Sequence, residues 1–333
     1  MNDSDTLDLD EAVTRLLPYA DPNGVQAQDG KPYLQPCLAI APQERDIFGS
    51  NLADRFSALT LPLPLAGAPL LAKEPDGQLA LTARLLARAP WLEPAILTID
   101  RQLRLQLWAG RPWLAWRPLC LAGPPGTGKS HLARLIGELA GTGCAVLDLG
   151  GTADNRTLEG TARGWASAQP CWPAVAVAQL RTANPVLVVE EIDKAGGSER
   201  SGVPHATLLT MLERGTAQSY WDKALLAEVN LAHCCWVLTC NDASLLPAVL
   251  RSRLTVIEVG HPSAEHFEAV LNALLAAQAQ EWGIAPAELP RLPRKAKAVL
   301  RQVFTRQRSI RALRGALERV LEALVDGAVR RVH

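Results

Sequence analysis

The sequence predicts an α/β protein in which a parallel β-sheet flanked by helices is followed by a small all-helical domain. Between about residues 117 and 258, short apolar runs alternate with stretches of helical periodicity, as in crossover units on a parallel sheet. After Gly260 only helical patterns remain. A glycine-rich octapeptide joins the first predicted strand to a helix, and this junction is where such sheets bind anions.

The predicted strands of the sheet are apolar runs of three to five residues, each followed by a turn or a helical stretch. They are Pro118–Ala122, Cys144–Leu147, Val186–Val189, Cys235–Thr239 and Thr255–Ile257. In the helical domain Ser263 is the expected N-cap of the first helix. The last helix is expected from about 309 to 331, with its apolar positions on one face.

The chain is therefore expected to divide into three parts. Residues 1–77 form a mostly helical or irregular N-terminal extension, with turn signals at Asp21–Gly24 and a Leu/Pro run at Leu61–Leu65. Residues 78–259 hold the sheet, preceded by helices in which apolar residues recur at three- and four-residue steps. Residues 260–333 form the helical domain.

The composition is that of a soluble globular protein. Of the 333 residues 48% are hydrophobic, and the formal net charge is zero, so attraction to nucleic acid or acidic lipid would require a local patch. The N-terminus begins with aspartates rather than the basic segment of a signal peptide, and no apolar stretch approaches about 20 residues. We expect a cytoplasmic protein without a membrane span and, from the scattered histidines, without a zinc site.

The octapeptide has the P-loop pattern and the strand-to-helix context that the pattern requires. Its glycines let backbone N–H groups turn inward around phosphate oxygens, while Lys129 neutralises the β- and γ-phosphates and Ser130 offers a hydroxyl to Mg²⁺. ATP and Mg²⁺ are the predicted ligands, and a Gly/Pro turn before a helix is the alternative. The residues are Gly123, Pro124, Pro125, Gly126, Thr127, Gly128, Lys129 and Ser130.

An acidic cluster follows another predicted strand, where a buried strand would deliver carboxylates to the phosphates. Of the pair Glu190 and Glu191, we assign Glu190 to hydrated Mg²⁺ and Glu191 to the attacking water. The alternative is an acidic strand end that enters a solvated loop.

With these motifs placed, the chain from about 90 to 330 resembles the AAA+ ATPase module of Lon-type proteases. The order and spacing of several segments carry the resemblance: Leu119–Gly126, Leu149–Gly151, Gly160–Pro170, Asn184–Lys194 and Leu250–Ile257. The resemblance implies a P-loop AAA+ core, an α-helical lid domain and an ATPase that works as a ring, expected to be a homo-hexamer.

The resemblance also implies roles for three polar residues. Asn241 looks like the sensor that orients the attacking water, although an Asn after a strand is often a turn former. Arg253 looks like the arginine finger that reaches into the next subunit's site, with Arg251 as the alternative. Arg311 looks like the second sensor, on the last helix, and a solvated surface arginine is its alternative.

Trp165 takes the place of the aromatic pore-loop residue with which Lon-like motors grip a polypeptide. The alternative is a tryptophan packed in the core. The pore-loop interpretation implies that the ATPase remodels or unfolds a protein client, with an adaptor or client as its partner.

Two features depart from the family pattern. Glu190 stands where the family usually carries Asp, and a longer side chain in a site that demands near-octahedral geometry puts the hydrolysis rate in doubt. The chain also stops about twenty residues beyond Arg311. We therefore expect no room for the Lon peptidase domain and no protease activity.

Two other functions stay open. Nine Lys/Arg and no acidic residue lie between Arg291 and Arg314, so a nucleic-acid-associated loader or helicase-like ATPase could track a phosphate backbone there. A slow, nucleotide-gated scaffold or switch is the other alternative, because of Glu190.

Overall fold

The computed structural model describes residues 37–42, 52, 55–67, 77–150, 155–196 and 203–332, with side chains described as far as residue 325. Within these residues, five parallel strands form the central sheet in the order β4-β5-β8-β3-β9. The bounds are β3 (Leu119–Ala122), β4 (Cys144–Asp148), β5 (Val186–Glu190), β8 (Cys235–Cys240) and β9 (Thr255–Glu258). The predicted fold class is confirmed.

The sheet is covered on both faces, which explains why the inner strands β3, β5 and β8 are buried along nearly their whole length. Side chains alternate along central β8: Cys235 and Val237 join one core cluster, whereas Trp236 and Leu238 join the other. The first cluster includes α3 (Ala80–Arg88), α4 (Glu93–Trp108) and α5 (Lys129–Ala140), and the second includes α7 (Trp172–Leu180), α8 (Pro204–Leu212) and α10 (Ala248–Ser252).

The leading helices begin where the helical periodicity predicts them, but they are interrupted. Pro90 opens a 3₁₀ turn, η5 (Pro90–Leu92), which ends α3 and starts α4 in a new direction. Trp91 on this turn is buried, and its position between two helices brings it to the P-loop.

Part of the predicted N-terminal extension packs on the sheet domain. An antiparallel pair, β1 (Cys37–Ala39) with β2 (Pro62–Pro64), and the turn η3 (Ser57–Thr60) lie on the α7 face. Asn184, fully buried before β5, accepts from the backbone N–H of Ala66 and donates to its carbonyl and to that of Leu114. The rest of the extension, including Asp21–Gly24, lies outside the described residues.

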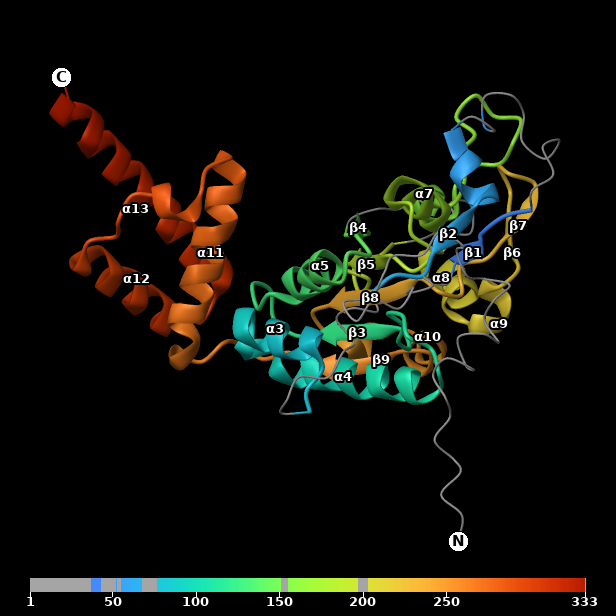
Figure 1. The fold of residues 1–333 in the computed structure, drawn as a ribbon, viewed down its shortest axis with the longest axis horizontal. Coiled ribbons are helices and arrows are strands. Elements are labelled where there is room, and N and C mark those ends of the chain that lie inside the picture. The colour runs from blue at the N-terminus through green and yellow to red at the C-terminus, as the bar shows by residue number, and fades with distance from the viewer. Residues whose placement is uncertain are drawn as a thin grey trace, which may run out of the picture.

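Short elements lie at the end of the molecule away from the C-terminal helices (Figure 1). These are α9 (Arg214–Ala217) and the hairpin of β6 (Tyr220–Asp222) with β7 (Ala227–Val229). Elsewhere, α6 (Arg156–Glu159) follows β4, and η6 (Ala243–Leu245) follows β8.

The C-terminal helices form a separate group at one end of the sheet domain (Figure 1). They are η7 (Ala264–His266), α11 (Phe267–Trp282), η8 (Pro286–Glu288), α12 (Arg294–Gln307) and α13 (Ile310–Val332). Ser263 is the N-cap, as predicted, and forms a capping box with His266. The rings of Phe267 and Phe304, 5.9 Å apart, hold α11 against α12. None of the helices in the described ranges has the length and apolarity needed to cross a bilayer.

Candidate nucleotide site

A pocket of about 350 Å³ opens at the carboxyl ends of β3, β5 and β8, beside the first turn of α13. Parallel strands present their carboxyl ends at one edge, so residues far apart in the sequence meet here. The described residues that line it are Pro125, Gly126, Thr127, Gly128, Lys129, Ser130, His131, Arg134, Glu190, Glu191, Thr239, Cys240, Asn241, Ile310, Arg311 and Arg314.

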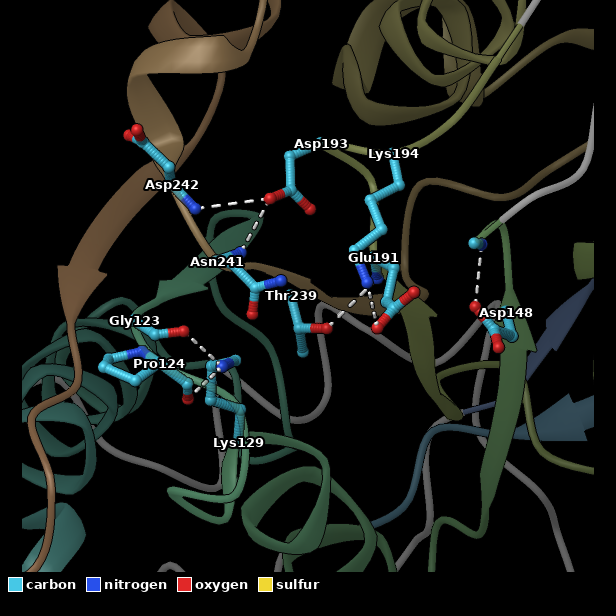
Figure 2. Close-up of polar contacts among 11 residues, drawn as sticks. Gly123, Pro124, Lys129, Asp148, Glu191, Asp193, Lys194, Thr239, Asn241 and Asp242 are labelled. Atoms are coloured by element: carbon cyan, nitrogen blue, oxygen red, sulfur yellow. Dashed lines mark hydrogen bonds and ion pairs between the residues drawn. The ribbon is translucent and has the colours of Figure 1, made fainter. Parts of the chain in front are cut away.

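Lys129 is held inside the P-loop by the backbone. Its Nζ donates to the carbonyl oxygens of Gly123, at 2.6 Å, and Pro124, at 2.9 Å (Figure 2). Burial lowers the pKa of this ammonium group from its ordinary value. The side chain is therefore oriented along the loop whose backbone N–H groups start α5.

Glycine is required at two positions of the P-loop, because both have a positive φ and neighbouring elements pack closely against them. Gly128 has φ 95°, and a Cβ there would lie 3.1 Å from Nε1 of Trp91. Gly126 has φ 79°, and a Cβ would lie 2.7 Å from Oγ of Ser309. The Gly126 carbonyl also accepts from the backbone N–H of Ile310 at 2.9 Å, which ties the helical domain to the P-loop.

Glu190, the last residue of β5, and Ser130 line the same pocket. A carboxylate and a hydroxyl are the hard oxygen donors that Mg²⁺ takes together with phosphate oxygens, so this pair fits the ion. Arg134 lies 3.4 Å from Oε1 of Glu190. Among the described residues no group of three or more His, Cys, Asp or Glu could hold a metal ion.

Glu191 begins the turn after β5 with a left-handed backbone, φ 55°, which is uncommon for a residue with a side chain. Its Oε1 pairs with Lys194 Nζ at 2.8 Å, and Figure 2 shows the carboxylate between Lys194 and Asp148. A Cβ on Gly150 would lie 2.2 Å from Glu191 Oε2, so the backbone after β4 leaves room for this carboxylate.

The position of Asn241 is set by Asp193, a residue to which we assigned no role from the sequence. Oδ2 of Asp193 accepts from the backbone N–H groups of Asn241, at 2.9 Å, and Asp242, at 3.3 Å (Figure 2). The Thr239 carbonyl in turn accepts from the N–H of Ile192 at 3.0 Å. The turns after β5 and β8 are thus bound to each other.

The helical domain contributes Arg311 and Arg314 from α13 to the pocket. A small apolar cavity of about 60 Å³ adjoins this side and shares His131, Ile310 and Arg314 with the pocket. Its other walls are Trp91 and residues of α11: Val270, Ala273, Leu274 and Ala277.

Trp91 and His131 form an aromatic wall at this junction. Their rings stack with centroids 6.4 Å apart and planes 13° from parallel, and Trp91 Nε1 donates to the Thr127 carbonyl at 3.0 Å. Burial, with the charges of Arg134 and Arg314, lowers the pKa of His131, so its ring is neutral at pH 7. The sequence alone does not predict that these residues lie at the site, because an apolar Pro90–Trp91 turn looks like any core segment.

Arg253 and Arg251 lie outside the pocket. Arg253, at the end of α10 before β9, forms an ion pair with Glu213 at the opposite edge of the sheet. Arg251 is nearer to the turn after β8 and donates to the Ala243 carbonyl at 3.5 Å. The structure therefore does not bring Arg253 to its own subunit's P-loop.

Trp165 is 71% exposed, so it is not a core residue. Its loop is closed by a bridge between Thr161 and Gln169. Arg163 fastens the loop to the β6–β7 hairpin: its backbone N–H donates to Lys223 O at 3.0 Å and its Nε donates to Ala224 O at 3.1 Å. The aromatic ring is held out on an anchored loop.

The basic run from Arg291 to Arg314 is divided between two surroundings. On α12, Lys297 and Arg301 both pair with Glu268 of α11, at 2.8 and 2.6 Å. At the other end of the run, Arg311 and Arg314 face the pocket. Nucleic-acid binding through this run stays an untested alternative.

Comparison with known proteins agrees with this geometry. Residues 119–260 match the family described as "ATPase family associated with various cellular activities (AAA)". Lon protease of Campylobacter concisus is 32% identical over 204 residues, 61% of this chain and 25% of the relative.

Two further relatives match a similar length. Lon protease 1 of Bacillus subtilis is 30% identical over 64% of this chain and 27% of the relative. A mitochondrial Lon protease homolog of Candida dubliniensis is 30% identical over 61% of this chain and 19% of the relative. The chain thus spans about a quarter or less of the length of these curated relatives.

Proposed function

We propose, from the match of residues 119–260 to the AAA ATPase family and the similarity to Lon proteases, that the chain binds and hydrolyses ATP with Mg²⁺ in a ring of its own copies. The observation that carries the proposal is the single pocket lined by Lys129, Glu190, Glu191, Asn241 and Arg311. Phosphoryl transfer to water needs the groups found here: two cations, two carboxylates and an amide.

The triphosphate lies along the P-loop, with Lys129 on the β- and γ-phosphates. Ser130 and Glu190 would hold Mg²⁺, which would neutralise phosphate charge when bound. The adenine lies where the pocket meets the small apolar cavity, beside His131 and Ile310, where the neutral imidazole offers a flat surface.

Glu191 takes a proton from the attacking water, and Asn241 orients that water through its side-chain amide. Asp193 is a positioning residue, because it fixes the backbone of Asn241. Arg311 senses the γ-phosphate from α13. The hydrogen bond from the Ile310 N–H to the Gly126 carbonyl couples movement of the P-loop to the helical domain.

We propose that the ring uses this cycle to move a protein client with Trp165, and that each subunit's Arg253 completes a neighbour's site. The exposed ring of Trp165 on an anchored loop and the position of Arg253 far from its own P-loop support these roles. A homo-hexamer is the assembly proposed.

The second candidate is a nucleotide-gated switch. The ion pair between Glu191 and Lys194 and the presence of Glu190 in place of an aspartate favour slow turnover. Tight ATP binding with a hydrolysis rate near zero in the assembled ring would support this candidate over the motor.

The proposal is tested first by Lys129→Ala, measured by titration with a fluorescent ATP analogue. We expect at least a 100-fold loss of affinity, because the buried ammonium is the only side-chain cation held inside the loop by described contacts. Lys295→Ala, on the exposed side of α12, is the matched control and should bind as the parent does. Unchanged binding by Lys129→Ala would contradict the proposed site.

A further inference from the structure

A second cavity, of about 320 Å³, lies at the amino ends of β3 and β8, at the edge of the sheet opposite the P-loop. Its walls come from the segment before β3, from the end of α8 and α9, and from the start of β8. Trp113, Trp116 and Trp236 give it an aromatic floor. Arg253 stands at this cavity rather than at the nucleotide pocket.

The charge of the cavity is strongly unbalanced. Among the described lining residues there are four arginines, Arg111, Arg117, Arg214 and Arg253, and one carboxylate, Glu213. Glu213 forms an ion pair with Arg253, which leaves the others without a neutralising carboxylate in the cavity wall. Such a convergence of like charges costs stability unless an anion enters.

Arg214 and Arg111 lie close enough to perturb each other and their neighbour. Burial and then the charge of Arg111 lower the pKa of Arg214. Burial, followed by the charges of Arg214 and Arg111, lowers the pKa of His233 to about 4. His233 is therefore neutral at pH 7, and the positive charge is that of the guanidinium groups, which present planar donors suited to phosphate oxygens.

We propose that Arg214, assisted by Arg111, is a further arginine that acts in trans on the neighbouring subunit's ATP, alongside Arg253. This inference rests on the proposed ring. The two cations cannot serve their own subunit's nucleotide, because they lie at the opposite edge of the sheet. Glu213 links Arg214 to Arg253, the proposed arginine finger, since it directly precedes Arg214 in the sequence and forms an ion pair with Arg253.

In the reaction, water oxygen forms a bond to the γ-phosphorus while the bond from that phosphorus to the β–γ bridging oxygen breaks. The bridging oxygen keeps the electron pair on ADP, and the water proton passes to Glu191. N–H donors of Arg214 and Arg253 stabilise the negative charge on the transferring oxygens.

The first experiment measures the kcat of ATP hydrolysis for assembled Arg214→Gln. We expect kcat to fall about 10- to 100-fold, while the ATP dissociation constant stays within about twofold of the parent value. The reason is that the Arg214 guanidinium stabilises negative charge that develops on the phosphate oxygens only in the transition state. Arg214→Lys keeps the charge and should recover part of the rate. Arg319→Gln, an exposed charge removal on α13, is the control and should leave kcat unchanged.

The second experiment separates action in trans from a structural role. Arg214→Gln subunits, with an intact P-loop, are mixed with Lys129→Ala subunits, which keep Arg214 but lack a working P-loop. Mixing should raise the rate per intact P-loop at least several-fold above that of Arg214→Gln alone. No gain on mixing, or a parental kcat for Arg214→Gln, would overturn the inference.

These outcomes are distinct from failure of the proposed function. If Arg253→Gln loses hydrolysis while Arg214→Gln retains it, the ring ATPase stands and the role of Arg214 is wrong. If the parent protein fails to hydrolyse ATP at any concentration, the proposed function itself is wrong.

Discussion

Single side chains hold this site through contacts with the backbone more than with one another. Lys129 is oriented by two P-loop carbonyls, and Asn241 is oriented by the Asp193 carboxylate. Trp91 is fixed by the Thr127 carbonyl. Because backbone groups move little, such contacts pre-organise the side chains before the substrate binds. Glu191 differs, since its contact is an ion pair with the half-exposed Lys194, and an exposed pair is worth little.

Glu191→Gln should keep ATP binding and lower kcat by at least about 100-fold, because an amide cannot take the proton of the attacking water. Single-turnover hydrolysis beside equilibrium nucleotide binding checks both parts. Lys194→Ala, which only removes the ion-pair partner, should keep kcat within a few-fold. Hydrolysis at the parent rate by Glu191→Gln would show that another group is the base.

His233 should make stability fall in mild acid. Its folded-state pKa of about 4 lies below the ordinary 6.5, because burial and the charges of Arg214 and Arg111 disfavour the imidazolium. The unfolded chain therefore binds the proton first, and stability is lost as the pH falls from 6.5 to about 4. The loss is at most roughly 3 to 4 kcal/mol, since one pKa unit corresponds to about 1.4 kcal/mol.

Urea unfolding of the parent and of His233→Gln at several pH values isolates this contribution from that of the carboxylates. The stability of the parent relative to the variant should fall across the pH window. A difference that is the same at pH 7 and pH 4 would contradict the assigned shift.

At the scale of elements, local motifs could be predicted and long-range contacts could not. The P-loop is one continuous segment whose glycines and strand-to-helix context act together, so eight neighbouring residues predict it. Trp91 and Arg314 reach the apolar cavity beside the pocket from segments far apart in the sequence. Neither an apolar turn nor a basic helix has a local sequence pattern that predicts such a position. The pairing of Glu213 with Arg253 is equally non-local. The sheet was predictable because its inner strands β3, β5 and β8 are buried on both faces and read as apolar runs.

The Trp165 loop is the element proposed to contact a protein client, and this role can be tested. Trp165→Ala should leave basal ATP hydrolysis within about twofold, because the loop packs on the β6–β7 hairpin and away from the P-loop. Casein, an unstructured polypeptide, should stimulate hydrolysis by the parent and by Trp282→Ala, an exposed tryptophan on α11, but not by Trp165→Ala. Equal stimulation of all three proteins would remove the pore-loop role.

At the scale of the whole molecule, the proposed reaction draws on residues at both edges of the sheet. The carboxyl edge, with the helical domain beside it, holds the nucleotide pocket. The amino edge holds Arg253 among further arginines. In this proposal, a cation at the edge opposite its own subunit's nucleotide acts only when copies assemble head to tail, and such an assembly forms a ring when its rotation closes.

The rate of ATP hydrolysis per subunit, measured as a function of protein concentration, tests this account most directly. We expect the rate to rise with concentration and reach a plateau, because each site gains a neighbour's Arg253 as the ring forms. A rate per subunit that stays constant from dilute to concentrated protein, whether near zero or substantial, would contradict an ATPase with shared sites.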